Sequence, residues 1–195
     1  GTGDIAIDGK SSALSGVRIY PGTTITAGGL ININGESTAT WGVSNSTGSS
    51  TNNNTYTSTI ESSKAPSSKT NTVTITSTTS ATAAATYFAW SPISILATGA
   101  KGGISISGAS ANHTQSVNLN NISVKTVSGD ITIDGGVKPI SMGAASQNVT
   151  IGKNSAGDSS GDIILRGAAF KTGGGSIAMS TTGAISMLPS SGQSD

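Results

Sequence analysis

Aspartates recur at two fixed positions of a repeated seven-residue motif, where paired carboxylates could do acid–base chemistry. Enzymes that cleave glycosidic bonds hold two carboxyl groups across the scissile bond, and calcium also binds clustered carboxylates. The first position carries Asp4, Asp130 and Asp162, and the second carries Asp8 and Asp134. Other copies of the motif break both series, with Leu30 and Gly103 at the first position and Asn34, Ser107 and Arg166 at the second. We therefore interpret the aspartates as parts of strand-entry turns and predict no catalytic residues.

The single histidine, His113, is also a weak candidate for catalysis or metal binding. It lies in Asn112-His113-Thr114, and the chain has no cysteine. Zinc sites and catalytic triads both need several such side chains converging on one point. We expect His113 to be a solvated loop residue. The sequence therefore predicts no enzyme, no metal site and no cofactor.

The largest apolar group in the chain is the aromatic cluster Tyr87, Phe88 and Trp90. One interpretation, which we favour, is an apolar plug on an end or flank of the fold. The alternative is a platform on which carbohydrate rings stack, since an aromatic side chain offers a large apolar face and Tyr and Trp add a polar tip. These three residues are the only candidate contact site for a glycan or another partner.

The composition excludes several classes of function. Of 195 residues, 34% are hydrophobic, 4% aromatic and 10% charged, and the net charge is +1. With no basic patch to follow a phosphate backbone, we expect no nucleic-acid partner. No apolar run approaches the length of a membrane-spanning helix, so we expect no membrane span. Without cysteine, the fold cannot depend on disulfides.

The repeated motif reads Gly, any residue, Ile, any residue, aliphatic, any residue, Gly. Its aliphatic side chains are two residues apart and so point to one face of an extended strand. The glycines at each end are expected to let the chain turn sharply, with positive φ where needed. Five full copies occur, at residues 3–9, 29–35, 102–108, 129–135 and 161–167, with weaker copies at 175–179 and 183–187.

Repeats of this kind predict an all-β solenoid, a parallel β-helix with coils of roughly 20–30 residues. One coil cannot bury its aliphatic face alone, whereas stacked coils bury a continuous column. We predict that the interior column contains Ile5, Ile31, Ile104, Ile131 and Ile163. A β-sandwich is less consistent with such short strands and a single Asn-Gly pair. A disordered Ser/Thr stalk does not explain the repeated Ile-x-aliphatic pattern.

We expect residues 1–188 to form one β-helix domain and residues 189–195 to form a flexible tail. Residues 36–72 are rich in Ser, Thr and Asn, and they are either an irregular insertion or thin strands of the same repeat. Spacing favours thin strands, because the gap between the motif glycines Gly29 and Gly102 fits three units of roughly 24 residues, a length found in solenoids. Since the chain begins inside a repeat, we take it for a piece of a longer protein or a processed product.

Three segments give the chain a family resemblance. The motif copy at 129–136, Gly-Asp-Ile-Thr-Ile-Asp-Gly-Gly, and the segments at 16–20 and 26–35 resemble filamentous-haemagglutinin-type exoproteins, the secreted partners of bacterial two-partner secretion. The similarity covers mainly residues 1–43 and 100–188. It implies a right-handed parallel β-helix, secreted to the bacterial cell surface or beyond. It also implies a role of the parent protein in adhesion, biofilm formation or cell–cell contact.

Three functions follow as hypotheses. The first is a non-enzymatic β-helical segment of a large secreted adhesin, whose partner is a glycan or protein on a host or neighbouring cell. The second is a subunit of a self-assembling extracellular fibre, joined by end-to-end self-association of coils. The third and least favoured is a glycan-cleaving enzyme, which loss of polysaccharide turnover on mutation of Asp130 or Asp134 would support.

Overall fold

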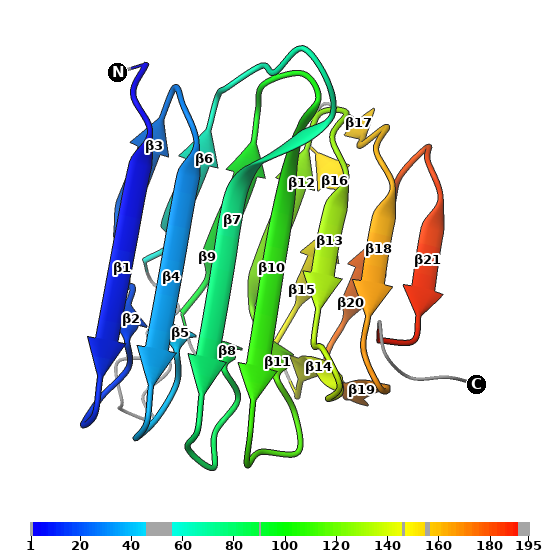
Figure 1. Cartoon of the computed structure of the whole chain (residues 1–195). Helices are drawn as coiled ribbons and strands as arrows, with labels where there is room; N and C mark the ends of the chain where they lie inside the picture. Colours follow the sequence, from blue (N-terminus) through cyan, green and yellow to red (C-terminus); the bar gives the residue numbers. More distant parts are fainter. Residues whose placement is uncertain (1, 46–55, 90, 146, 155–156, 191–195) are drawn as a thin grey trace.

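The computed structural model describes residues 2–45, 56–89, 91–145, 147–154 and 157–190, and these form a right-handed parallel β-helix (Figure 1). Three parallel sheets make up the walls. In Figure 1 the strands of the nearer sheet run downward, and the chain crosses at the bottom and returns upward along the far side while it advances from β1 towards β21. This sense of winding is right-handed, as the family resemblance implied.

Each of the first six coils contributes one strand to each sheet, and the last strand, β21, adds to sheet A alone. Sheet A contains β1 (Ile5–Ser11), β4 (Ile31–Ser37), β7 (Thr70–Thr79), β10 (Gly102–Ser110), β13 (Ile131–Asp134), β18 (Ile163–Arg166) and β21 (Ile185–Leu188). Sheet B contains β2 (Val17–Arg18), β5 (Val43–Ser44), β8 (Thr86–Phe88), β11 (Val117–Leu119), β14 (Ile140–Ala144) and β19 (Phe170–Gly173). Sheet C contains β3 (Thr24–Ala27), β6 (Ser58–Ser62), β9 (Ile93–Ala97), β12 (Ile122–Thr126), β15 (Val149–Ile151) and β20 (Ile177–Met179). A small antiparallel pair, β16 (Lys153–Asn154) and β17 (Gly157–Asp158), lies between β15 and β18.

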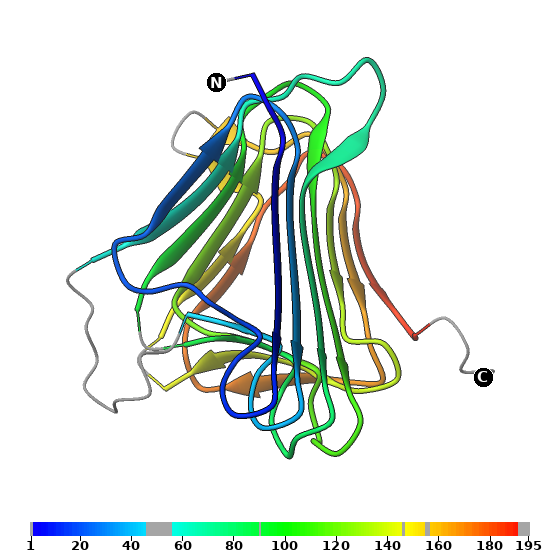
Figure 2. The same cartoon turned by 60° about the vertical axis from the view of Figure 1, so that its left-hand side comes forward.

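The three sheets enclose an interior of roughly triangular cross-section (Figure 2). Alternate residues of each strand point into it, which gives patterns such as buried–half-buried–buried along β9 and β12. The strands form because these β-branched and aliphatic residues alternate with polar ones at period two. No helix long and apolar enough to cross a bilayer occurs in the described part of the chain.

The predicted interior column is confirmed. Ile5 pairs with Ile31, Ile104 pairs with Ile131, and Ile131 pairs with Ile163. Val73 fills the position between Ile31 and Ile104. From Ile31 to Ile163 every side chain in this column is fully buried. Stacking β-branched aliphatic side chains in register is therefore what makes the core continuous.

The predicted spacing of coils is wrong in the first half of the chain. Ile31 pairs with Val73 and Val73 with Ile104, so two coils, not three, lie between Ile31 and Ile104. The described parts of residues 36–72 carry β5, β6 and the start of β7, which are strands of the same helix. The extra length lies in the connections around these strands.

The prediction that the motif glycines make turns with positive φ is also wrong at Gly9 and Gly35. Strands β1 and β4 continue past these glycines to Ser11 and Ser37. A Cβ added to Gly35 would lie 2.1 Å from the carbonyl oxygen of Gly42, which immediately precedes β5, and a Cβ added to Gly9 would lie equally close to Gly16 O. Glycine is needed at this corner for space rather than for backbone conformation.

Buried hydroxyl groups lie at the ends of three strands of sheet A, β4, β7 and β10. Ser37 Oγ donates a hydrogen bond to Leu14 O at 2.7 Å and accepts one from Thr40 N at 3.0 Å. One coil later, Thr79 Oγ1 donates to Thr40 O at 2.6 Å. Ser110 Oγ repeats the pattern with Ala83 O at 2.9 Å. We call Ser37, Thr79 and Ser110 the hydroxyl ladder. Each member turns the chain out of sheet A and bonds to the coil before it, which satisfies polar groups at a buried corner.

Both ends of the helix leave core side chains partly uncovered. Strand β1 forms one edge of sheet A and β21 the other (Figure 1). Ile185 and Met187 of β21 are 47% and 52% exposed, whereas their equivalents in β13 are fully buried. At the opposite end, Ile5 and Ile7 are only partly buried. The interior thus reaches the surface at each end.

Candidate functional site

The first series of aspartates holds successive coils together. Asp4 Oδ1 accepts a hydrogen bond from Leu30 N at 2.7 Å. Asp130 Oδ1 accepts from Asp162 N, and Asp162 Oδ1 accepts from Ala184 N, both at 2.9 Å. Each carboxylate therefore binds the backbone amide at the equivalent position of the next coil. These aspartates therefore bridge successive coils at the edge where the chain enters sheet A.

The second series does not form a carboxylate pair. Asp8 and Asp134 share one column of sheet A, but β4, β7 and β10 separate their strands. Four strand spacings put them about 19 Å apart, beyond the roughly 5–9.5 Å between catalytic carboxyl groups of glycosidases. Asp8 Oδ1 accepts from Asn34 Nδ2, and Asp134 Oδ1 accepts from Gly136 N, both at 2.7 Å. Among the described residues, no group of three or more His, Cys, Asp or Glu is placed to hold a metal ion.

Asp130 also forms a partly exposed ion pair with Lys69, which reaches over from the loop before β7. The two charged groups are 2.7 Å apart. Partial burial raises the pKa of the Asp130 carboxyl. The hydrogen bonds from Lys69 and from the Asp162 amide, with the Lys69 charge, outweigh burial, so the pKa lies below the ordinary 3.8. The same hydrogen bond and the charge of Asp130 raise the pKa of Lys69 above 10.5.

These shifts predict how the ion pair contributes to stability at different pH values. Because the folded pKa of Asp130 is lowered, the contribution is complete above the unfolded pKa and is lost as pH falls through the folded value. Because the folded pKa of Lys69 is raised, the contribution is complete below 10.5 and is lost as pH rises beyond it. We expect Asp130→Asn to destabilise the chain at pH 6–8 and to have much less effect near pH 2.

Chemical unfolding of the wild type and Asp130→Asn across pH 2–8 measures this difference. Asparagine keeps an oxygen that can accept from Asp162 N, so the substitution tests the charge and not the backbone contact. Lys69→Met serves as the matched variant, since it removes the other half of the same pair and should give the same pH profile. A destabilisation that is equal at pH 2 and pH 7 would contradict the assignment.

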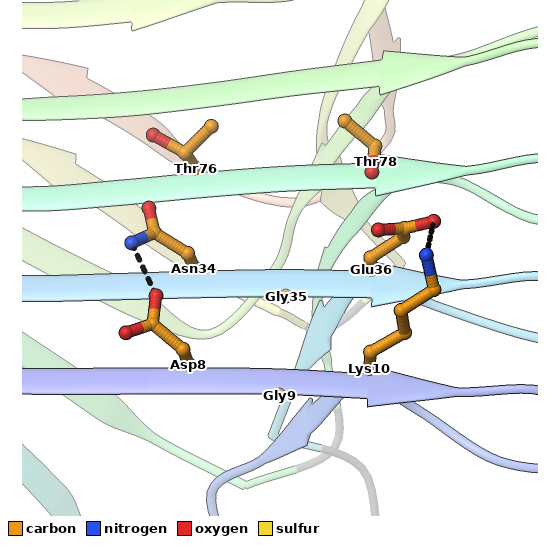
Figure 3. Close-up of a pocket in the computed structure, with 8 residues that line it drawn as sticks. All are labelled: Asp8, Gly9, Lys10, Asn34, Gly35, Glu36, Thr76 and Thr78. Carbon is orange, nitrogen blue, oxygen red and sulfur yellow. Dashed lines mark hydrogen bonds and ion pairs between the residues drawn. The ribbon is translucent and has the colours of Figure 1, made fainter.

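A shallow groove crosses the outer face of sheet A at strands β1, β4 and β7 (Figure 3). Its volume is about 380 Å³, and it is lined by Asp8, Gly9, Lys10, Asn34, Gly35, Glu36, Thr76 and Thr78. Lys10 Nζ lies 2.8 Å from Glu36 Oε1, and both side chains are well exposed. The charged groups therefore already have partners in neighbouring strands. This shallow groove therefore presents a ligand with a row of exposed polar groups.

The predicted aromatic platform is only partly present. Phe88 is fully buried in the core, because it occupies an inward position of β8, where it pairs with Leu119 of β11. Phe88 therefore cannot contact a glycan, and the prediction that it does is wrong. It packs in the core instead of plugging an end. Tyr87 lies on the outward side of β8 and is half-buried. Trp90 lies outside the described residues.

The aromatic partner of Tyr87 is Trp41, which lies outside the aromatic cluster predicted from the sequence. The two rings stack with centroids 4.8 Å apart and an interplanar angle of 15°. Trp41 precedes β5, and β5 pairs with β8 through Val43 and Thr86, so the two rings belong to successive coils. The signal that could have found this pair is the register between coils, which the irregular spacing of residues 36–72 concealed.

The stacked rings form part of a second groove on the outside of sheet B, which we call the Trp41 groove. It has a volume of about 360 Å³ and is lined by Trp41, Thr82, Ala83, Ala84, Tyr87, His113, Thr114, Gln115 and Asn118. His113, expected to be a solvated loop residue, is half-buried in the turn between β10 and β11. Its Nδ1 lies 3.2 Å from Gln115 N, which donates to it.

Of the two grooves, only the Trp41 groove combines aromatic faces with polar side chains. Small-molecule sites share this composition, and its volume is within their usual range of roughly 300–1,000 Å³. Comparison of the chain with protein-family models, with curated proteins and with solved structures gave no match in any of the three.

Proposed function

We propose that this chain is a non-enzymatic β-helical segment of a large secreted bacterial surface protein that mediates adhesion or cell–cell contact. The observation that carries the proposal is a stack of in-register coils whose outward positions in sheet A carry mainly small polar side chains. The motif's resemblance to filamentous-haemagglutinin-type exoproteins points the same way.

The outer surface supports a role in contact rather than catalysis. The aspartates that recur in the motif bond to backbone amides or neighbouring side chains. The outward positions of sheet A carry mainly small polar side chains, such as Asn32, Thr74, Ser105 and Thr132. A long flat surface of this kind can make many weak hydrogen bonds to a partner.

Two measurements test this proposal together. Antibodies raised against the chain should label the surface of intact bacteria that produce it, and fluorescent chain should bind saturably to host or neighbouring cells. Unlabelled chain should compete, and heat-unfolded chain should not. Antigen found only after the bacteria are permeabilised, or no saturable binding to any cell type, would overturn the proposal.

A second candidate function is that of a subunit in a self-assembling extracellular fibre. The exposed strand edges and apolar side chains at both ends favour it, since an unpaired parallel edge can template another strand. Negative-stain electron microscopy should then show fibres that grow with concentration. Met187→Asp at the open end should abolish them, whereas Val137→Asp, at a side position that is 64% exposed, should not. Monomers at all concentrations would exclude this candidate.

A further inference from the structure

The Trp41 groove has an apolar wall made from two coils. Trp41 and Tyr87 are both half-buried and stack nearly parallel, so each supports the other as a rigid aromatic surface. Tyr87 is in register with Ser44 on one side and with Asn118 on the other. The aromatic pair therefore stands beside the polar residues contributed by the next coil. Rigid aromatic walls of this kind bind ligands with little loss of side-chain entropy.

The polar side of the groove comes from β11 and the turn before it. Asn118 lines the groove, and its Oδ1 accepts a hydrogen bond from Asn120 Nδ2 at 2.5 Å, which fixes the orientation of the amide. The side-chain amide of Gln115 has no partner among the described residues, and Thr82 and Thr114 place exposed hydroxyl groups at the rim. These groups supply both donors and acceptors.

We propose that the Trp41 groove binds a neutral saccharide, with one pyranose ring against the Trp41–Tyr87 pair and its hydroxyl groups bonded to Gln115 and Asn118. This inference rests on the proposed function and names the partner class of that surface. A pyranose has an apolar C–H face and a polar edge, which matches an aromatic wall beside amide side chains. Its hydroxyl groups both donate and accept, as the amides do.

The charge of the groove selects among ligands that stack on aromatic rings. No Asp, Glu, Lys or Arg lines it. A nucleic-acid site would pair its aromatic side chains with a positively charged track, and an acidic sugar would need a cation for its carboxylate. The lining holds no Lys or Arg for either purpose, and its only ionisable side chains are His113 and Tyr87. An uncharged sugar is the ligand whose polar groups this lining can satisfy.

The test uses the full chain on an array of neutral and acidic oligosaccharides, followed by calorimetric titration with the best neutral ligand. Trp41→Ala should weaken binding about tenfold or more, because it removes the stacked wall. Gln115→Ala, which leaves the aromatic pair intact, should also weaken binding. Tyr56→Ala is the matched control, since this tyrosine is 58% exposed outside the groove, and it should bind as the wild type does.

Several results would overturn the inference. They are binding of acidic sugars, peptides or nucleic acid alone, no neutral ligand at millimolar concentration, or full affinity in Trp41→Ala and Gln115→Ala. Circular dichroism of each variant establishes that it is folded, and Gln115→Ala decides the matter if Trp41→Ala does not fold. Cell binding that survives both groove variants would reject the saccharide site and leave the adhesion proposal standing. Saccharide binding without any cell binding would reject adhesion alone.

Discussion

Ile104→Ala is expected to lower the free energy of unfolding by about 2–5 kcal/mol, as for large-to-small substitutions in other protein cores. Ile104 is fully buried at the centre of the stack, between Val73 of one coil and Ile131 of the next. The surrounding strands are fixed by backbone hydrogen bonds on both sides. The walls therefore cannot collapse into the space that the substitution leaves, and the lost contacts are not replaced.

Ser105→Ala is the matched control for this prediction. Ser105 follows Ile104 in β10 but points outward, so its replacement should change stability by no more than about 0.5 kcal/mol. Urea unfolding followed by circular dichroism measures both variants. Equal stability of Ile104→Ala and the wild type would mean that this column is not the core of the protein.

Gly35→Ala is expected to destabilise the chain by about 3 kcal/mol or more, at the upper end of overpacking effects. The new Cβ would lie 2.1 Å from Gly42 O and 2.7 Å from Val43 Cγ2. The nearest atom belongs to the backbone and not to a flexible side chain. Relief therefore requires β4 to move away from the start of sheet B, which would disturb the pairing of β4 with both β1 and β7.

Gly3→Ala tests whether the effect comes from this close approach. A Cβ at Gly3 would meet nothing within 4 Å, so its replacement should be neutral or slightly stabilising. Thermal unfolding of both variants separates the two sites. If Gly35→Ala has the same melting temperature as the wild type, sheets A and B are further apart at this corner than the structure places them.

The interior column could be predicted from the sequence because the pleat of a strand imposes a period of two. Ile104 and Ile106 must share a face, and stacking of coils is the way to bury that face. The lengths of the coils could not be predicted in the same way. The connections around β5 and β6 are polar and carry no periodic signal, so one long coil resembles two short ones.

The role of the motif glycines could not be predicted from the sequence for a related reason. A position can require glycine because its φ is positive or because a neighbouring atom leaves no room for a Cβ. The sequence alone does not distinguish these two causes. Only the structure shows that Gly35 lies against Gly42 O, whereas Gly22 and Gly152 take φ values of 79° and 81°. The stacked Trp41 and Tyr87 were hidden too, because their contact depends on which coil lies beside which.

The hydroxyl ladder makes each of these coils of the β-helix depend on the coil that precedes it in the sequence. Ser37, Thr79 and Ser110 each donate to a carbonyl group of the coil that precedes them in the sequence. A coil that forms after its predecessor therefore finds its acceptor already in position, whereas one that forms earlier has none at this corner. A chain released into solution from its amino end can add one finished layer at a time, and the growing end serves as the template for the next layer.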